Sequence, residues 1–149
     1  MAFYDNVDTT KKFRLGARKT SVDNREFIYL TGVASTTANS WVSYDEAGVT
    51  AGLDTDVQTS GPVAIAMAAV DSTSKYGWYG IWGSFTGRAI DPVADNKTVY
   101  ATSTVFVCDD AATSVGRVNG ATWRSINDSV AGTATVQIQY PYLGEDLSA

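Results

Sequence analysis

The sequence predicts an all-β fold: a single compact antiparallel β-barrel or β-sandwich with an extended N-terminal arm. At least five segments alternate apolar residues with polar or small ones at a period of two, which is typical of strands. No segment keeps the 3.6-residue period of an amphipathic helix over ten or more positions. The length of 149 residues suits one domain with one core. We therefore expect an arm over residues 1–25, a β domain over residues 26–149, and seven or more antiparallel strands between residues 26 and 140.

The first 25 residues differ in charge from the rest of the chain. They hold six basic and three acidic residues, a net charge of +3, whereas the remainder holds five basic and thirteen acidic residues, a net charge of −8. Their larger apolar residues follow neither a helical nor a strand period, so this segment cannot form a core of its own. We expect an extended arm that is disordered in the free protein.

Two roles are open for this arm. It is either a solvated, flexible terminus or an element that grips an acidic protein surface and becomes ordered on binding. In the second case its basic side chains would form salt-sensitive pairs and its apolar side chains would fill shallow pockets. The residues that would do so are Phe3, Tyr4, Lys11, Lys12, Phe13, Arg14, Leu15, Arg18 and Lys19.

The first predicted strands follow directly after the arm. In residues 26–35 (EFIYLTGVAS) apolar side chains fall on both faces, as expected of a strand that is covered on two sides. Residues 40–48 (SWVSYDEAG) continue with a strand that ends in a turn. Residues 61–70 (GPVAIAMAAV) place larger apolar side chains on one face and alanines on the other, which favours a strand beside a close neighbour over a helix.

Three later segments complete the predicted sheet. Residues 98–107 (TVYATSTVFV) alternate valine and alanine with threonine and tyrosine over most of their length. In residues 118–123 (VNGATW) the Asn-Gly pair is the strongest short hairpin signal of the chain. Residues 133–142 (TATVQIQYPY) are expected to point Ala134, Val136, Ile138 and Tyr140 inward and Thr135, Gln137 and Gln139 outward.

Residues 75–87 (KYGWYGIWGSFTG) alternate aromatic residues and glycines almost one for one. Glycine weakens a strand unless a bend, a bulge or a large neighbouring side chain occupies the space that it leaves. The run therefore predicts a strongly coiled central strand, with aromatic rings lying across glycines of adjacent strands, and we expect Trp78 and Trp82 to be mostly buried. The expected aromatic core comprises Tyr76, Trp78 and Trp82 on one face, Tyr79 and Phe85 with Ile81 on the other, and Trp41 from the preceding segment.

The sequence contains no histidine, which is the commonest general base and metal ligand. Its absence excludes Ser-His-Asp and Cys-His machinery and zinc sites with histidine ligands. A glycosidase would need two acids that face each other across a cleft, but the acidic pairs lie beside small turn residues, where aspartate caps its own backbone. We therefore expect no enzymatic activity, no catalytic residues, no metal ligands and no cofactor. The acidic pairs are Asp45-Glu46, Asp54 with Asp56, Asp109-Asp110 and Glu145-Asp146.

The single cysteine, Cys108, ends an apolar run, and we expect it to be a buried, unreactive thiol. Without a second cysteine no internal disulfide can form, which fits assembly in a reducing compartment. No apolar run reaches the roughly 20 residues that cross a bilayer, and the first residues do not resemble a secretory signal. We therefore expect no membrane partner, and the acidic body disfavours nucleic acid as a partner as well.

The segments over residues 26–35, 40–48 and 61–83 (GPVAIAMAAVDSTSKYGWYGIWG) stand in an order that resembles the head decoration, or cement, proteins of tailed bacteriophages. In that family an alternating valine and alanine strand leads through a polar turn into a Gly-Trp strand. The resemblance covers about residues 26–87 and does not cover the arm. It implies a structural protein of the virion that binds the outer surface of the head and stabilises it by clamping neighbouring major capsid subunits, often as a homotrimer. Assembly would take place in the cytoplasm of the bacterial host.

A carbohydrate-binding β module of a phage tail or of a cell-surface protein is the alternative. Exposed aromatic rings stack on sugars, so such a module would use some of its tryptophans as a stacking platform. It predicts that at least two tryptophans are exposed on one face. The candidates are Trp41, Trp78, Trp82 and Trp123.

Overall fold

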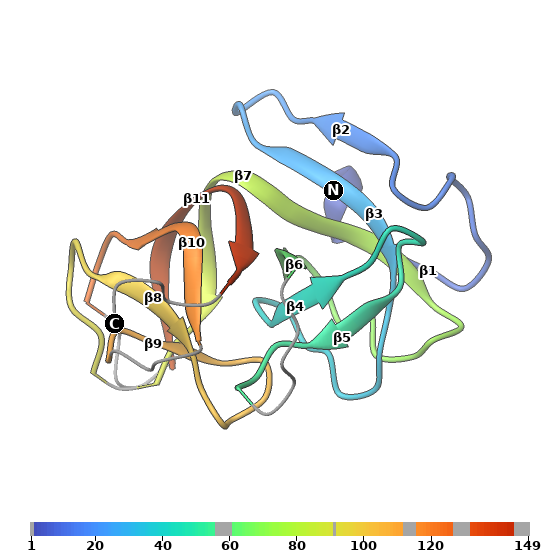
Figure 1. The fold of residues 1–149 in the computed structure, drawn as a ribbon. Helices are drawn as coiled ribbons and strands as arrows, with labels where there is room; N and C mark the ends of the chain where they lie inside the picture. Colours follow the sequence, from blue (N-terminus) through green and yellow to red (C-terminus); the bar gives the residue numbers. More distant parts are fainter. Residues whose placement is uncertain (1, 56–60, 91, 112–115, 127–131, 145–149) are drawn as a thin grey trace.

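The sheet is built around one long strand, β7 (Tyr76–Arg88), which runs through both halves of the molecule (Figure 1). The computed structural model describes residues 2–55, 61–90, 92–111, 116–126 and 132–144. These residues contain eleven strands, one short 3₁₀ helix and no α-helix, which confirms the predicted all-β fold. In chain order the other elements are η1 (Phe3–Asp5), β1 (Val7–Asp8), β2 (Arg18–Thr20), β3 (Glu26–Thr31), β4 (Trp41–Tyr44), β5 (Thr50–Gly52), β6 (Gly61–Ala66), β8 (Thr98–Ala101), β9 (Cys108–Asp109), β10 (Arg117–Trp123) and β11 (Thr133–Leu143).

All eleven strands join one sheet, and every pairing between them is antiparallel. The main path runs in the order β2, β3, β7, β6, β11, β10, β8, β9, while β1 pairs with β7 and β4 pairs with both β5 and β6. Nine of the strands, β3 to β11, begin at or after Glu26, so the expectation of seven or more antiparallel strands in this region is confirmed.

β7 changes its partners along its length. Its first half pairs with β3 and its second half pairs with β11. The pairs Phe27–Gly80 and Glu26–Trp82 are one residue apart on β3 but two residues apart on β7. The extra residue, Ile81, marks a β-bulge, which bends a strand and increases its twist. The strongly coiled central strand predicted from the glycine and aromatic run therefore contains a defined irregularity.

The bulge changes which face the later residues of β7 occupy. Trp78 and Phe85 belong to one buried cluster, whereas Tyr79 and Ile81 belong to the other. Simple alternation, which groups Phe85 with Tyr79 and Ile81, is therefore wrong. Next to the bulge, Gly83 has a φ of 118°, a conformation that side-chain-bearing residues rarely adopt.

Two apolar clusters cover the two faces of the central strands. In β3, Phe27 and Tyr29 belong to the larger cluster, and Ile28 and Leu30 belong to the smaller one. β6 alternates in the same way, with its valine and isoleucine in the larger cluster and its alanines in the smaller one. The prediction that β3 is covered on both faces is confirmed, and β6 is covered on both faces as well.

The sheet curls so that strands that do not pair face each other across the larger cluster. The rings of Trp41 on β4 and Trp123 on β10 meet edge to face with centroids 6.0 Å apart. Their indole N–H groups donate to the backbone oxygens of Arg88 at 3.0 Å and Asp109 at 3.1 Å. Because buried indole N–H groups need a partner, these bonds hold both rings in one orientation.

Most of the rings that we expect in the aromatic core are buried. Trp41, Trp78, Tyr79 and Phe85 are buried and Tyr76 is half-buried. Trp82, by contrast, is 37% exposed, so the prediction that it is mostly buried is wrong. It lies opposite Glu26 on β3 and Gln139 on β11, and residues directly opposite share a face. This face of the sheet is only partly covered at that point.

The Asn119-Gly120 pair does not form a hairpin turn. Both residues lie inside β10, and the register with β11 shifts between Asn119 and Ala121. Gly120 has a φ of 78°. The hairpin prediction is therefore wrong: the left-handed backbone of Gly120, which hairpin turns and bulges both use, here marks an irregularity within a strand.

The N-terminal residues lie against the β domain. β1 pairs with β7 and β2 pairs with β3 (Figure 1). Phe3 meets Phe27 and Trp78 edge to face at 5.4 Å, and Tyr4 stacks on Phe27 at 4.6 Å. The segment is largely extended, but the expectation that it is disordered in the free protein does not agree with this structure. A segment without its own core is held here by backbone pairing and by aromatic contacts to another element.

Candidate functional site

The segment between β1 and β2 is anchored by one buried polar contact. Asp8, only 6% exposed, accepts a hydrogen bond from the Tyr29 hydroxyl at 2.7 Å and forms an ion pair with Lys12 at 3.3 Å. The backbone N–H of Lys12 donates to the same hydroxyl at 3.2 Å. Burial is the main reason why the pKa of Tyr29 rises to about 12. The phenol therefore stays neutral, and it fixes the start of the segment.

Backbone hydrogen bonds fix the end of the same segment. The N–H of Gly16 donates to the carbonyl of Tyr29 at 2.8 Å, and the N–H of Tyr29 donates to the carbonyl of Ala17 at 2.9 Å. β2 continues this pairing and ends the main path of the sheet, and all three of its residues are exposed. Arg18 and Lys19 thus stand on an edge strand. Charged side chains are typical of edges that must not pair with other chains.

The structure divides the predicted arm residues into two groups. Phe3, Tyr4 and Leu15 are partly buried and lie against the larger cluster, so their apolar surface is already occupied. The other six are exposed on the segment before β2 and on β2 itself, and we call them the basic edge: Lys11, Lys12, Phe13, Arg14, Arg18 and Lys19.

The basic edge combines free charge with one exposed ring. Phe13 is 44% exposed, although its other side meets Tyr29 and Trp78 edge to face. Lys11 and Arg14 form no ion pair with any residue that the structure describes. The Lys19 ammonium lies over the Phe3 ring at 4.4 Å, a contact that leaves its charge uncompensated.

Arg18 connects the basic edge with an exposed group of tyrosines. Its guanidinium forms an ion pair with Glu26 at 3.8 Å and lies 5.8 Å from the ring centre of Tyr140, whose hydroxyl also bonds to Glu26. Tyr140 and Tyr142 are 50% and 53% exposed. We call this surface the tyrosine patch; it surrounds a hollow of about 360 Å³ lined by Arg18, Tyr44, Gly61, Pro62, Tyr140, Pro141 and Tyr142.

Sequence reasoning missed the tyrosine patch. Tyr140 is expected to point inward with Ala134, Val136 and Ile138, but its φ of 46° interrupts the alternation of β11 and turns its side chain outward. That expectation is wrong for Tyr140 and confirmed for the other three, which are buried. The only signal in the sequence is Pro141, because proline in a strand often accompanies an irregularity.

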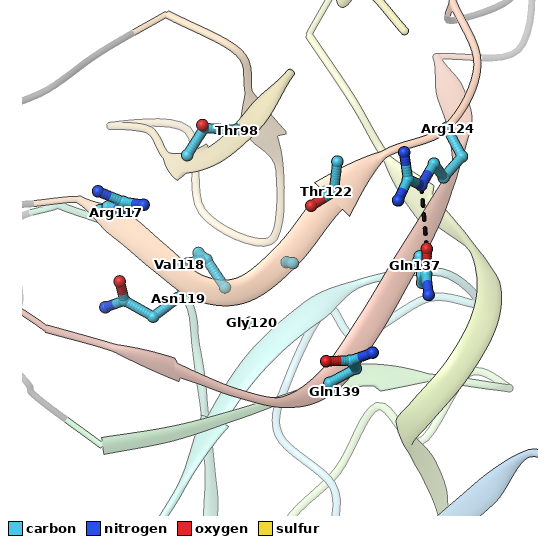
Figure 2. Close-up of a pocket in the computed structure, with 10 residues that line it drawn as sticks. Thr98, Arg117, Val118, Asn119, Gly120, Thr122, Arg124, Gln137 and Gln139 are labelled. Carbon is cyan, nitrogen blue, oxygen red and sulfur yellow. Dashed lines mark hydrogen bonds between the residues drawn. The ribbon is translucent and has the colours of Figure 1, made fainter. Parts of the chain in front are cut away.

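A second hollow lies where the register between β10 and β11 shifts (Figure 2). It has a volume of about 300 Å³, and polar side chains from three strands point into it. We call it the polar groove; it is lined by Thr98, Arg117, Val118, Asn119, Gly120, Ala121, Thr122, Arg124, Gln137 and Gln139. A third hollow of about 420 Å³ shares Arg124 and Gln137 with it and extends to Trp82.

The tryptophans do not form a stacking platform. Trp41, Trp78 and Trp123 are at most 3% exposed, which leaves Trp82 as the one tryptophan with substantial exposure. The expectation of two exposed tryptophans on one face, which belongs to the carbohydrate-binding alternative, is therefore wrong. The sequence indicates that rings cluster but not which of them faces solvent.

The acidic pairs that the structure describes act as backbone caps. Asp45 accepts hydrogen bonds from the N–H groups of Ala47 at 2.9 Å and Val49 at 3.0 Å, and Asp110 accepts one from Ala94 at 3.0 Å. Asp56, Glu145 and Asp146 lie outside the described residues. In the described ranges no group of three or more histidine, cysteine, aspartate or glutamate residues could hold a metal ion.

Cys108 is fully buried, as predicted, and burial raises the pKa of its thiol well above the ordinary value. Within the described part of the chain, no helix is long and apolar enough to span a membrane. No family model, no curated protein and no solved structure matches the chain.

Proposed function

We propose that this protein is a non-enzymatic structural protein that binds the outer surface of a tailed-phage head and stabilises it by clamping neighbouring major capsid subunits. The observation that carries the proposal is the basic edge, an exposed row of cations on a chain whose residues 26–149 have a net charge of −8. The resemblance of residues 26–87 to head decoration proteins supports the same assignment. The protein would be assembled in the host cytoplasm and reside on the virion.

The basic edge and the tyrosine patch have complementary roles in this proposal. Exposed ion pairs contribute only about 0 to 1 kcal/mol each, so the cations would mainly accelerate the encounter with an acidic capsid surface. Phe13 and the exposed tyrosines would contribute most of the affinity, because aromatic residues and arginine are enriched in protein interfaces. Arg18 belongs to both surfaces, which makes them one continuous docking face.

The folded state of the N-terminal segment also favours tight binding. An arm that becomes ordered only on the capsid would lose about 1 to 2 kcal/mol of backbone entropy per residue on docking. Here β1 and β2 are already paired within the protein, so most of this cost falls on folding and not on binding. The exposed members of the basic edge can therefore act as a preformed contact.

We further propose a homotrimer, because closed cyclic symmetry is the usual form of homo-oligomers and matches the three-fold positions of an icosahedral shell. Three docking faces on one rigid unit would bind far more tightly than one. Light scattering should find a trimer. Monomers alone at high protein concentration would contradict this part of the proposal.

Co-sedimentation with undecorated heads of the phage that encodes the chain tests the function. The protein should sediment with the heads, and its association rate should fall steeply as salt rises. A variant with Lys11→Gln, Arg14→Gln and Lys19→Gln should associate about tenfold more slowly at low salt and respond less to added salt.

The matched control carries Lys75→Gln, Arg88→Gln and Lys97→Gln, which removes the same number and kinds of charge elsewhere. It should bind as the unmodified protein does. Equal behaviour of the two variants would contradict the role of the basic edge, and failure of the unmodified protein to sediment with heads at any salt concentration would contradict the function itself.

A further inference from the structure

The polar groove exists because two neighbouring strands depart from regular pairing at the same place. Asn119 lies opposite Tyr142 and Ala121 lies opposite Ile138, so a step of two residues on β10 matches a step of four on β11. On the other side of β10 the register with β8 also shifts between Val118 and Thr122. The face of the sheet has a hollow of about 300 Å³ at this irregularity (Figure 2).

The backbone of both strands is irregular at this point. Gly120 has a φ of 78°, and a Cβ atom added to it would lie 2.7 Å from the carbonyl oxygen of Gln139. On the opposite strand Tyr140 has a φ of 46°, which a residue with a side chain seldom adopts. Strained backbone of this kind is found disproportionately at functional sites.

The chemistry of the lining is unusual for this chain. Although the net charge of the protein is −5, none of the ten lining residues is acidic and two are arginines. Arg117 and Arg124 lie at the two ends of the groove (Figure 2). Between them the lining offers hydroxyl and amide groups from Thr98, Asn119, Thr122, Gln137 and Gln139.

Neither arginine is neutralised by a carboxylate among the described residues. Arg124 donates to the side-chain oxygens of Gln137 at 3.0 Å and Asn96 at 2.6 Å, so its guanidinium is held in place by uncharged partners. Arg117 takes part in no ion pair within the described ranges. Two guanidinium groups without a carboxylate partner among the described residues favour an anion, above all a carboxylate, which arginine can bind through two parallel hydrogen bonds.

The ring of Trp82 lies in a hollow that adjoins the polar groove at Arg124. The adjoining hollow contains Arg124, Gln137 and the exposed Trp82, and Trp82 pairs directly with Gln139 of the groove. Trp82 thus offers a ring surface beside a row of hydrogen-bonding groups. Sites with an apolar surface and a few placed polar groups are typical of small-molecule binding.

We propose that the polar groove binds a carboxylate-bearing saccharide. The carboxylate would pair with Arg117, the ring hydroxyls would bond to the amides and threonines, and a neighbouring sugar would lie on Trp82. A nucleic acid fits less well, because its affinity comes from neutralising many phosphates and this groove holds two cations on an acidic body. The inference does not rest on head binding, because the groove is lined by Arg124 and residues of β8, β10 and β11, and of these strands only β11 also carries residues of the tyrosine patch.

Isothermal titration at 150 mM salt with two acidic probes, tetragalacturonate and tetrameric α2,8-linked sialic acid, tests the proposal against the neutral maltotetraose. At least one acidic probe should bind and change the fluorescence of Trp82, while maltotetraose should not bind. Arg117→Gln should weaken binding at least tenfold, whereas Arg88→Gln, on β7, should leave it unchanged.

Thermal unfolding of both variants shows whether they are folded. The proposal would be overturned if neither acidic probe bound at millimolar concentration. It would also be overturned if maltotetraose bound as tightly as the acidic probes, or if Arg117→Gln and Arg88→Gln weakened binding equally. Tighter binding of single-stranded DNA than of both acidic sugars would also overturn it, in favour of a nucleic-acid site. Head co-sedimentation is measured separately, so its failure would leave this result intact.

Discussion

The ring of Phe85 occupies the space beside Gly80 on the same strand. A Cβ atom added to Gly80 would lie 2.3 Å from Cε1 of Phe85, far closer than carbon atoms that are not bonded approach each other. The contact depends on the bulge at Ile81, which brings Phe85 to the face that Trp78 occupies. The glycine and aromatic run is thus explained partly within β7 itself, where a ring lies across a glycine of its own strand.

Gly80→Ala should therefore destabilise the protein. Adding a methyl group to a filled core forces side chains or backbone to move, which costs about 1 to 3 kcal/mol of the free energy of unfolding. Gly144→Ala is the control, because a Cβ atom there would lie no closer than 3.4 Å to its neighbours, and it should change stability by less than about 0.5 kcal/mol. Urea denaturation measures both, and equal stabilities would show that β7 is packed differently.

The N-terminal segment should be protected from hydrogen exchange in the free protein. The amide of Gly16 donates to the carbonyl of Tyr29 in the sheet, whereas the amide of Lys11 has no backbone acceptor among the described residues. Slow exchange at Gly16 and fast exchange at Lys11 are therefore expected. If residues 2–25 all exchange as an unfolded chain does, the sequence-based expectation of a disordered arm is right and the docked arrangement is wrong.

Stability should fall in strongly alkaline solution as Tyr29 ionises. Its pKa in the folded protein is about 12, above the ordinary value of 10.0, because burial disfavours the phenolate. The raised pKa contributes stability that is fully present below pH 10 and is lost between pH 10 and pH 12. The loss should be on the order of 2 kcal/mol.

Tyr29→Phe should be less stable at neutral pH, because Asp8 loses its hydrogen bond, and its stability should fall less steeply between pH 10 and pH 12. Some alkaline loss should remain, since burial also raises the pKa of Tyr79. Denaturant unfolding at several pH values gives both slopes. If the stability of the variant falls as steeply with pH as that of the unmodified protein, the alkaline loss arises from groups other than Tyr29.

Local patterns predict most of the strands because alternation is a property of each segment alone. β3 and β6 are covered on both faces, and their apolar runs indicate this directly. The exposure of Trp82 could not be predicted in this way, because it depends on which residues of β3 and β11 lie opposite. Pairing between distant segments decides what covers a given ring.

The candidate surfaces depend even more on such pairing. The charge of residues 1–25 is visible in the sequence, but the contacts of Phe3 and Tyr4 with Phe27 become apparent only when the segment meets β3 and β7. The polar groove needs irregularities in two strands at once. The Asn-Gly pair signals the irregularity at Gly120, because glycine readily adopts left-handed backbone. Tyrosine has no such preference, so the sequence does not signal the irregularity at Tyr140.

A reconstruction of undecorated heads incubated with a saturating amount of the protein tests the proposed function most directly. The account predicts added density on the outer surface of the shell, where neighbouring major capsid subunits meet, with β2 and Phe13 facing the capsid. Heads that gain no density under these conditions, or density in which neither β2 nor Phe13 contacts the shell, would contradict it.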